Sequence, residues 1–363
     1  MPVFGWNSDR RRRPWWPALL LVVLSGVVSP PSWAQQDYAV VIMYHHVGVA
    51  EYPSTNVTVK QFRAHMGYLA AHGFHVLPLE DVVRRLQQGR SFPDRAIAIT
   101  FDDAYESVYS TARPLLERRG WPYTVFVSTD YIDRGYRNYM SWAQMRRAAA
   151  DGARFANHSR SHPHLPRLQA SGSGKVADEL HYAQRRLEAE LGKAALSDPP
   201  LFAFPFGEYD AGVAATVREH GYVAFGQQSG PVGPHSDPRA LPRFPFNEHY
   251  ADVQGFATKV TSRPLPLESV APWDPVVHSD SAPPMTVKLA TAVSHAQDLR
   301  CYFRGERETV HWLQPGRRFR VEPSAQLPAG RSRYNCTLVA PGGGYYWYSH
   351  LWIKDSGTEG LKD

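Results

Sequence analysis

The chain has 363 residues, of which 43% are hydrophobic and 20% are charged, so it can bury a sizeable core and is not intrinsically disordered. Its formal net charge is +6, and the sequence beyond residue 34 has neither a basic tract nor a phosphate-binding glycine loop. This argues against a nucleic-acid-binding protein. Only two cysteines are present, Cys301 and Cys336, which excludes a disulfide scaffold and a cysteine-rich zinc site.

Residues 1–34 predict a cleavable export signal. The basic cluster Arg10–Arg13 precedes an apolar run over Ala18–Val28, and Ser32 and Ala34 are the small residues that signal peptidase reads, so cleavage is expected after Ala34. A single membrane anchor is the alternative, but the run is shorter than the roughly 20 residues of a spanning helix, and we expect no membrane span after cleavage. Removing the segment lowers the net charge from +6 to +3, because it carries four arginines and one aspartate. A periplasmic or secreted protein is expected, and the two cysteines can form a disulfide there.

Between residues 35 and 263, short apolar runs alternate with amphipathic stretches in the rhythm of a parallel sheet covered by helices. Helices are predicted at Val59–Ala71, Leu79–Gln88 and Asp178–Leu191, each ending close to a glycine. The predicted strands are Ala39–Tyr44, Phe74–Leu77, Ala96–Phe101, Tyr123–Val127, Arg154–Ala156, Leu201–Phe204 and Tyr222–Phe225. The sequence therefore predicts an α/β fold of the distorted (β/α)7-barrel type, with functional residues at the carboxyl ends of the strands.

Residues 264–280 are rich in proline and predict a linker, and residues 281–363 predict a small all-β, sandwich-like C-terminal domain. The strands expected there are Thr286–Ala290, Leu299–Phe303, Arg318–Val321, Asn335–Val339 and Tyr345–Ile353. A disulfide between Cys301 and Cys336 could join the two sheets of this sandwich. The aromatic residues Tyr345–Tyr348 and Trp352 could bind a glycan, but strand alternation favours placing half of these rings in the core.

Two pairs of residues carry candidate chemistry. Asp102 and Asp103 follow the predicted strand Ala96–Phe101, and neighbouring positions of an extended chain point in different directions, so the two carboxylates can serve different tasks. His158 and His162 are four residues apart, a spacing that on a helical turn suits one divalent ion bound together with an acid from elsewhere. Taken alone, either pair is equally explained by helix-capping aspartates or by surface histidines.

Together with Phe204–Gly207, the motifs Thr100–Asp103 and His158–His162 resemble, in this order and at these intervals, the polysaccharide deacetylases of carbohydrate esterase family 4. The resemblance covers approximately Val40–Val260. His164 lies two positions beyond the histidine motif, and we leave it outside the ligand set. The resemblance implies hydrolysis of N-acetyl groups, a reaction at carbon–nitrogen bonds other than peptide bonds.

Carried over residue by residue, the resemblance makes Asp103, His158 and His162 the ligands of one divalent metal ion and Asp102 the general base. Zinc is the expected metal, with nickel, cobalt, iron and manganese as alternatives. A divalent ion suits this reaction because it polarises the acetyl carbonyl and activates water. An unligated carboxylate beside it can accept the proton of that water.

The third motif implies a further role and shows one departure. In the family, a backbone N–H after the motif's proline stabilises the oxyanion, and here the proline is Pro205 and the next residue is Phe206. The usual arginine two residues before this proline, which pairs with the base, is replaced by Ala203. Arg243 lies where a permuted subgroup also has an arginine; the alternative is an ordinary surface arginine.

A candidate for the general acid lies at the start of the domain. The segment Val41–Val47 resembles the circularly permuted subgroup that deacetylates poly-N-acetylglucosamine, in which the strand that bears the acid comes first. The resemblance makes His45 the general acid, at the carboxyl end of its strand. A structural turn histidine is the alternative for His45, and the neighbouring His46 should face a different way.

We therefore expect an exported, metal-dependent deacetylase that acts on a bacterial exopolysaccharide of N-acetylhexosamine units, similar to the poly-N-acetylglucosamine of biofilms. Peptidoglycan or a chitin-like oligomer is the alternative substrate. A catalytically silent glycan-binding protein is a second alternative, for which Ala203 is the main support. No nucleic acid is expected as a partner; contact with an exopolysaccharide export machinery stays open, and the oligomeric state is not predicted.

Overall fold

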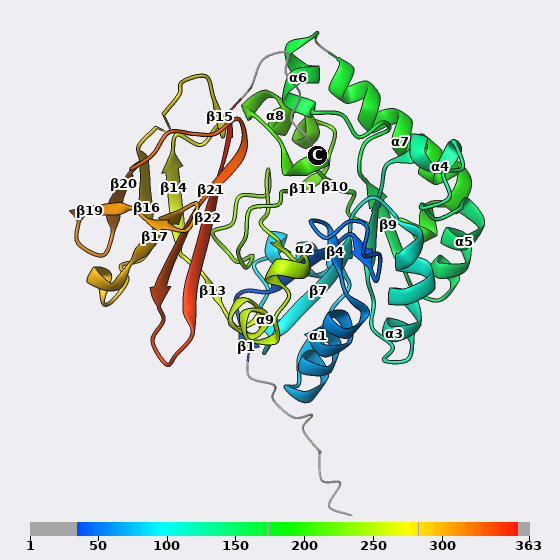
Figure 1. Ribbon diagram of the computed structural model, residues 1–363, viewed down its shortest axis with the longest axis horizontal. Coiled ribbons are helices and arrows are strands. Elements are labelled where there is room, and N and C mark those ends of the chain that lie inside the picture. Colours follow the sequence, from blue (N-terminus) through cyan, green and yellow to red (C-terminus); the bar gives the residue numbers. More distant parts are fainter. Residues whose placement is uncertain (1–34, 173, 282, 355–363) are drawn as a thin grey trace, which may run out of the picture. The chain divides into compact units, whose positions relative to one another are not determined.

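The structure is a computed structural model that describes residues 35–354 except 173 and 282, so the predicted export signal lies outside the described residues. An α/β region comes first along the chain and a strand-rich region follows it (Figure 1). Among the helices of the described residues, none combines the length and hydrophobicity that crossing a bilayer requires.

The α/β region is built on a parallel sheet with the strand order β11-β10-β9-β8-β7-β2-β12, and β5 also pairs with β7. Its strands are β2 (Val40–Tyr44), β5 (His75–Val76), β7 (Ala96–Phe101), β8 (Thr124–Val127), β9 (Arg154–Asn157), β10 (Leu201–Ala203), β11 (Val223–Phe225) and β12 (Phe244–Pro245). Because β11 and β12 end the strand order, the sheet is a curled half-barrel rather than a closed barrel. The predicted α/β architecture is confirmed, and β12 is an additional strand.

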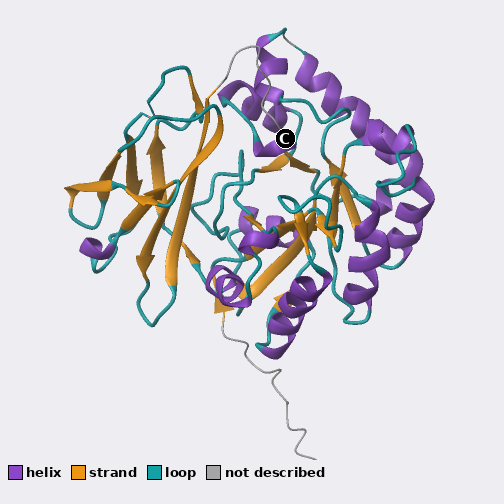
Figure 2. Ribbon diagram, in the orientation of Figure 1, coloured by secondary structure: helices purple, strands orange, loops and turns teal. Residues whose placement is uncertain are grey.

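The sheet is buried on both faces, as its continuous apolar strands require. In β7, Ile97 and Ile99 face one hydrophobic cluster and Ala96 and Ala98 face the other. Figure 2 shows the helices outside the sheet. They are α1 (Val59–Ala71), α2 (Leu79–Gln87), α3 (Arg113–Glu117), α4 (Thr129–Asp133), α5 (Trp142–Ala150), α6 (Leu165–Ala170), α7 (Lys175–Leu191), α8 (Ala211–Glu219) and α9 (Val253–Val260), with a π-helical turn at Val108–Ala112.

Short elements complete the α/β region. The two-residue strands β1 (Gln35–Gln36) and β6 (Phe92–Pro93) pair with each other, as do β3 (His46–Val47) and β4 (Asn56–Val57). Single 3-10 turns lie at Lys193–Ala195, Pro205–Gly207 and Glu248–Tyr250, and a further one lies at Ala296–Asp298 in the strand-rich region.

The strand-rich region contains two sheets, with the orders β13-β22-β21-β17-β18 and β14-β16-β20-β19, and β15 also pairs with β22. Their strands are β13 (Arg263–Pro264), β14 (Leu267–Ala271), β15 (Val276–Val277), β16 (Met285–Leu289), β17 (Arg300–Phe303), β18 (Glu306–Arg307), β19 (Thr309–Gln314), β20 (Arg318–Glu322), β21 (Gly330–Val339) and β22 (Tyr345–Lys354). One hydrophobic cluster unites apolar side chains of both sheets, so the region is sandwich-like as predicted. The proline-rich segment 264–280 is itself partly paired, through β13, β14 and β15.

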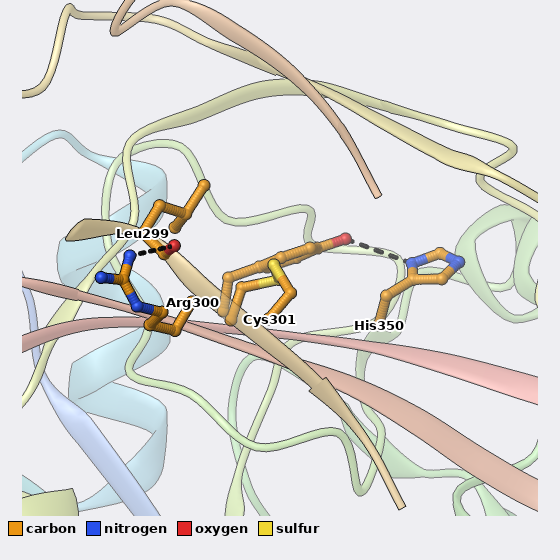
Figure 3. Close-up of a disulfide and its surroundings, with 6 residues drawn as sticks. Leu299, Arg300, Cys301 and His350 are labelled. Atoms are coloured by element: carbon orange, nitrogen blue, oxygen red, sulfur yellow. Dashed lines mark hydrogen bonds between the residues drawn. A yellow bond between two sulfur atoms is a disulfide. The ribbon is translucent and has the colours of Figure 1, made fainter. Parts of the chain in front are cut away.

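The two cysteines form a disulfide within one sheet (Figure 3). Cys301 of β17 lies directly opposite Cys336 of β21, and their Cα atoms are 4.0 Å apart. The expectation that this bond joins the two sheets is wrong. Both cysteines belong to one sheet, because β17 and β21 are hydrogen-bonded neighbours that bring the opposite Cα atoms within reach of a disulfide.

The aromatic residues of β22 follow the alternation of the strand. Trp352 is fully buried in the sandwich core, and Tyr346 and Tyr348 pack against that core. Trp347 lies on the opposite face, where its ring contacts Phe244 of β12. The structure thus uses most of these rings for packing.

Candidate active site

The candidate residues meet at the carboxyl ends of neighbouring strands. Tyr44 of β2 pairs with Phe101 of β7, so His45 and the two aspartates Asp102 and Asp103 begin at the same edge of the sheet. His158 follows β9 at that edge. The structure therefore assembles these residues from segments that are far apart in sequence.

Asp103, His158 and His162 form the candidate metal centre. Asp103 Oδ1 is 3.4 Å from His158 Nε2 and 3.3 Å from His162 Nε2. One ligand atom from each of the three residues lies within 4.8 Å of the others, and His158 and Asp103 are buried. One carboxylate and two imidazole nitrogens facing a common point are a donor set that fits a divalent ion such as zinc.

His158 and His162 come together through a loop, and the expected helical turn is not formed. Ser159 and His162 both adopt left-handed backbone conformations, with φ values of 69° and 55°. Two local hydrogen bonds hold the loop, in which Asn157 Oδ1 accepts from the Ser159 N–H at 2.9 Å and Ser159 Oγ accepts from the His162 N–H at 3.0 Å. These side-chain acceptors compete with helical hydrogen bonding and explain the departure.

The orientation of His158 is fixed by Ala203. Nδ1 of His158 donates to the Ala203 carbonyl oxygen at 2.7 Å, which leaves Nε2 as the unprotonated atom that faces Asp103 in the neutral imidazole. Burial lowers the pKa of His162 to about 4, although the charge of Asp103 opposes this shift. A neutral imidazole is the form that binds a metal ion.

Asp102 is paired with Arg243. The guanidinium Nη1 and Nη2 atoms donate to the two carboxylate oxygens at 2.7 Å each, and both side chains are fully buried. Nε of Arg243 donates to the Gly226 carbonyl oxygen at 3.0 Å, and Nη1 lies 3.3 Å from Thr100 Oγ1. Burial alone would raise the pKa of Asp102, but the charges of Arg243 and His158 outweigh it, so the pKa is lowered and the carboxylate is ionised. Arg243 thus forms the ion pair with Asp102 that the usual arginine, here replaced by Ala203, would form.

The two adjacent histidines have different surroundings. Nε2 of His45 lies 4.0 Å from Asp103 Oδ2 and its side chain is 13% exposed, so it borders the candidate metal centre. The ring of His46 is stacked between Tyr52 and Tyr105, with centroid separations of 4.7 and 3.6 Å. His46 is therefore a packing residue.

Tyr105 is a site residue that the sequence motifs did not reveal. Burial and then the charge of Asp103 raise the pKa of its phenol, and Tyr139 adds to this shift. The phenol therefore stays protonated and can donate to the carboxylate. Its position directly after the two aspartates and Ala104 is the only signal for this role in the sequence.

Phe206 closes another side of the site. It follows Pro205 in a 3-10 turn and has a left-handed φ of 57°. Its ring lies edge-on to His162 and is stacked on His164, with centroid separations of 4.3 Å in both cases. His164 Nδ1 lies 2.7 Å from Glu208 Oε2, so His164 supports Phe206 rather than the ligand set.

Comparison with known families identifies the α/β region. The "Polysaccharide deacetylase" family profile matches residues 89–225, which include both aspartates, both candidate histidine ligands and Phe206. The Bacillus subtilis protein YxkH, whose name describes a polysaccharide deacetylase, is 24% identical over 189 residues, which are 50% of this chain and 61% of that protein. The poly-beta-1,6-N-acetyl-D-glucosamine N-deacetylase of Staphylococcus epidermidis is 23% identical over 231 residues, covering 58% of this chain and 79% of that protein. For the Escherichia coli protein of the same name, the match covers only 33% of its length.

Solved structures agree with this assignment at the level of the fold. The Streptococcus pyogenes deacetylase PplD, solved with acetate, has a TM-score of 0.55 and 19% identity, and the alignment covers 61% of this chain and 98% of that one. IcaB from Ammonifex degensii has a TM-score of 0.53 and 22% identity, with 61% and 97% covered. The α/β region therefore matches the polysaccharide deacetylase profile over residues 89–225 and has the fold of a deacetylase domain.

Proposed function

We propose that this protein is an exported, metal-dependent enzyme that removes acetyl groups from a polymer similar to poly-β-1,6-N-acetylglucosamine. The observation that carries the proposal is the convergence of Asp103, His158 and His162 beside an Asp102 that is held ionised by Arg243. The relatives named as poly-beta-1,6-N-acetyl-D-glucosamine N-deacetylases support the choice of polymer.

The metal would be held by Asp103 and by Nε2 of His158 and His162, and zinc suits this mixture of nitrogen and oxygen donors. When bound, it would supply Lewis-acid polarisation of the acetyl carbonyl and a more acidic water. Two features favour metal binding: the hydrogen bond to Ala203 fixes the tautomer of His158, and burial keeps His162 neutral.

The protein side chains divide the proton transfers between them. Asp102 accepts the proton of the attacking water, because both of its oxygens keep a lone pair beyond the hydrogen bond each receives from Arg243. The backbone N–H of Phe206 stabilises the charge that develops on the carbonyl oxygen. His45 donates a proton to the amine nitrogen as the carbon–nitrogen bond breaks, which yields acetate and the free amino sugar.

A group of aromatic rings beside the site suits a sugar polymer. Tyr105 contacts Tyr139 at a centroid separation of 4.8 Å, and Tyr131 is stacked on Tyr139 at 5.0 Å. Tyr136 extends the group outward and is 44% exposed. Flat, partly exposed rings pack well against the apolar faces of pyranose rings, while their hydroxyls bond to sugar hydroxyls.

Export would bring the enzyme to this substrate. The signal expected in residues 1–34 would deliver it to the periplasm or the exterior, where a polymer leaving its export machinery is accessible. Detection of the chain in the periplasmic or culture fraction, shortened by residues 1–34, tests this part of the proposal.

The decisive experiment is acetate release by the purified protein from poly-N-acetylglucosamine, peptidoglycan and chitin oligomers, with and without a chelator. We expect release from poly-N-acetylglucosamine to be fastest, to stop with the chelator and to return when zinc is added. Release from peptidoglycan or chitin oligomers alone would show that one of these, and not poly-N-acetylglucosamine, is the substrate. Binding of a glycan without any acetate release would instead support a catalytically silent protein.

A further inference from the structure

One face of the β21–β22 pair packs against the deacetylase domain. Trp347 Nε1 of β22 donates to Ser229 Oγ at 2.9 Å, and Ser229 Oγ donates to Asn335 Oδ1 of β21 at 3.1 Å. Leu351 and Ile353 share a hydrophobic cluster with apolar side chains of β10 and α8. Because side chains alternate along a strand, the odd-numbered residues of β21 face the same way as Asn335. This alternation directs Arg331, near the start of β21, toward the deacetylase domain.

Arg331 reaches the turn that carries the expected oxyanion donor. Its Nη1 donates to the Phe206 carbonyl oxygen at 2.8 Å, and its guanidinium carbon lies 5.3 Å from the centre of the Phe206 ring. Its Nε is 3.8 Å from Glu208 Oε1, and the Glu208 side chain is only 2% exposed. A residue 125 positions away in sequence thus holds the Phe206 carbonyl through a charged donor.

The Phe206 turn needs such support. Phe206 has a left-handed φ of 57°, a conformation that is unfavourable for residues other than glycine. The ring of Phe206 is stacked on His164, which Glu208 holds, and its edge faces the candidate ligand His162. The contacts of Arg331, Glu208 and His164 therefore fix both the carbonyl group and the ring of Phe206.

We propose that Arg331 is a positioning residue for deacetylation, through which the strand-rich region completes the active site. It holds the Phe206 carbonyl, on the peptide that follows Phe206, and thereby restrains the backbone turn in which the Phe206 N–H points at the developing oxyanion; it also balances the buried charge of Glu208. The expected effect of Arg331 on kcat rests on the proposed function. The physical contact between Arg331 and the Phe206 turn is tested independently of activity.

The test uses the full chain with the substitutions Arg331→Ala and Arg331→Lys. In Arg331→Ala we expect kcat to fall about 10- to 100-fold, as for a small displacement of one oxyanion donor, with KM changed less than about twofold. Lysine keeps the charge but cannot form both contacts, so Arg331→Lys should be intermediate. Millimolar guanidinium ion should restore part of the Arg331→Ala rate, which a general loss of structure would not allow.

Hydrogen exchange measured by mass spectrometry supplies the readout that needs no substrate. Amides of residues 204–208 should exchange faster in Arg331→Ala than in wild type, with metal content unchanged. Arg318→Ala, at an exposed position of β20, is the matched control and should change neither exchange nor kcat. Unchanged exchange, or an unchanged kcat in an active enzyme, would overturn the inference. If the wild type releases no acetate, the proposed function fails, while the exchange comparison still decides whether Arg331 holds the turn.

Discussion

Asp102 and Asp103 are neighbours in sequence, yet their side chains have separate partners. Asp103 faces His158 and His162, whereas Asp102 forms a buried, two-pronged ion pair with Arg243. One carboxylate is therefore placed to bind a metal and the other to accept a proton. Substitutions at these positions should have separable effects on metal content and on turnover.

The first prediction concerns the candidate ligands. Wild-type protein should bind about one divalent ion, and His158→Ala and His162→Ala should each lose most of it, because each removes one of three protein ligands. Metal analysis after dialysis measures this directly. His164→Ala is the control, since His164 is bound to Glu208 and should leave the metal in place. Full metal content in both ligand variants would contradict the assignment.

The second prediction separates the base from its partner. Asp102→Asn should lower acetate release by about 10²-fold or more with the metal retained, because a carboxamide cannot accept the water's proton. Arg243→Gln leaves a buried carboxylate without its counter-charge and should lower the free energy of unfolding by about 3–5 kcal/mol.

Combining the two substitutions provides the control. In Asp102→Asn with Arg243→Gln, neither buried charge is left unpaired, so the double variant should be more stable than Arg243→Gln alone. Urea unfolding of the four proteins gives the coupling. Strictly additive losses would show that the two side chains do not depend on each other.

The third prediction concerns the general acid. His45→Ala should slow turnover by about 10²–10⁴-fold without displacing the metal, because protonation of the leaving amine is lost. His46→Phe is the matched control, since it keeps an aromatic ring between Tyr52 and Tyr105. Wild-type turnover in His45→Ala would place the acid elsewhere, with His235 and His249 as the next residues to substitute.

At the scale of elements, local sequence signals predict long or strongly patterned elements better than short or exposed ones. The helix Val59–Ala71 forms over its predicted residues because Thr58 and Gln61 make a reciprocal capping box and Gly73 follows its end. The strand β12 has two residues, and its pairing with β2 depends on the whole sheet. The strand β19 is mostly exposed, and its alternation is limited to Val310 and Trp312, which pack against the sandwich core.

The same division applies to the site. The spacing of the aspartate and histidine motifs reveals the candidate ligands, because those residues lie close together within two short segments. Arg243 is 141 residues from Asp102, and Arg331 is 125 residues from Phe206. A resemblance pointed to Arg243, but no local pattern marks Arg331, since its role depends on how the strand-rich region packs.

The fourth prediction tests a contact between elements. His65 of α1 is fully buried, where Nε2 donates to the Ala251 carbonyl oxygen before α9 and Nδ1 accepts from the Tyr44 hydroxyl of β2. Burial lowers its pKa from 6.5 to about 4, although the bond to Ala251 opposes the shift. Below pH 6.5 the unfolded chain therefore takes up a proton that the folded chain does not. Stability that is fully present above pH 6.5 is lost as the pH falls toward 4, by about 2 kcal/mol at pH 5.

Comparing wild type with His65→Gln isolates this effect. Glutamine can accept from the hydroxyl of Tyr44 and donate to the carbonyl of Ala251, but it does not titrate. Urea unfolding at pH 7.5 and pH 5 should show a smaller loss of stability in the variant. Equal losses in the two proteins would mean that His65 is protonated in the folded state.

At the scale of the whole chain, the strand-rich region is packed onto the deacetylase domain by shared apolar clusters. Leu351 and Ile353 of β22 lie in one cluster with Phe202 of β10, and Trp347 packs against the cluster that contains Phe244. An interface of this kind couples the folding of the two regions. We therefore expect thermal unfolding to be a single transition, in which tryptophan fluorescence changes together with metal release.

The last prediction uses the disulfide to test this coupling. The bond joins β17 to β21 across 35 residues, and removing it in Cys301→Ala with Cys336→Ala should cost about 3–4 kcal/mol, because the unfolded chain gains the freedom of that loop. Since the two regions share apolar clusters, the variant should still unfold in a single transition, at a lower melting temperature. Its metal content at 25 °C should be unchanged. Two separate transitions in the variant would show that the regions fold independently. Two free thiols in protein isolated from the periplasm would show that the bond does not form there.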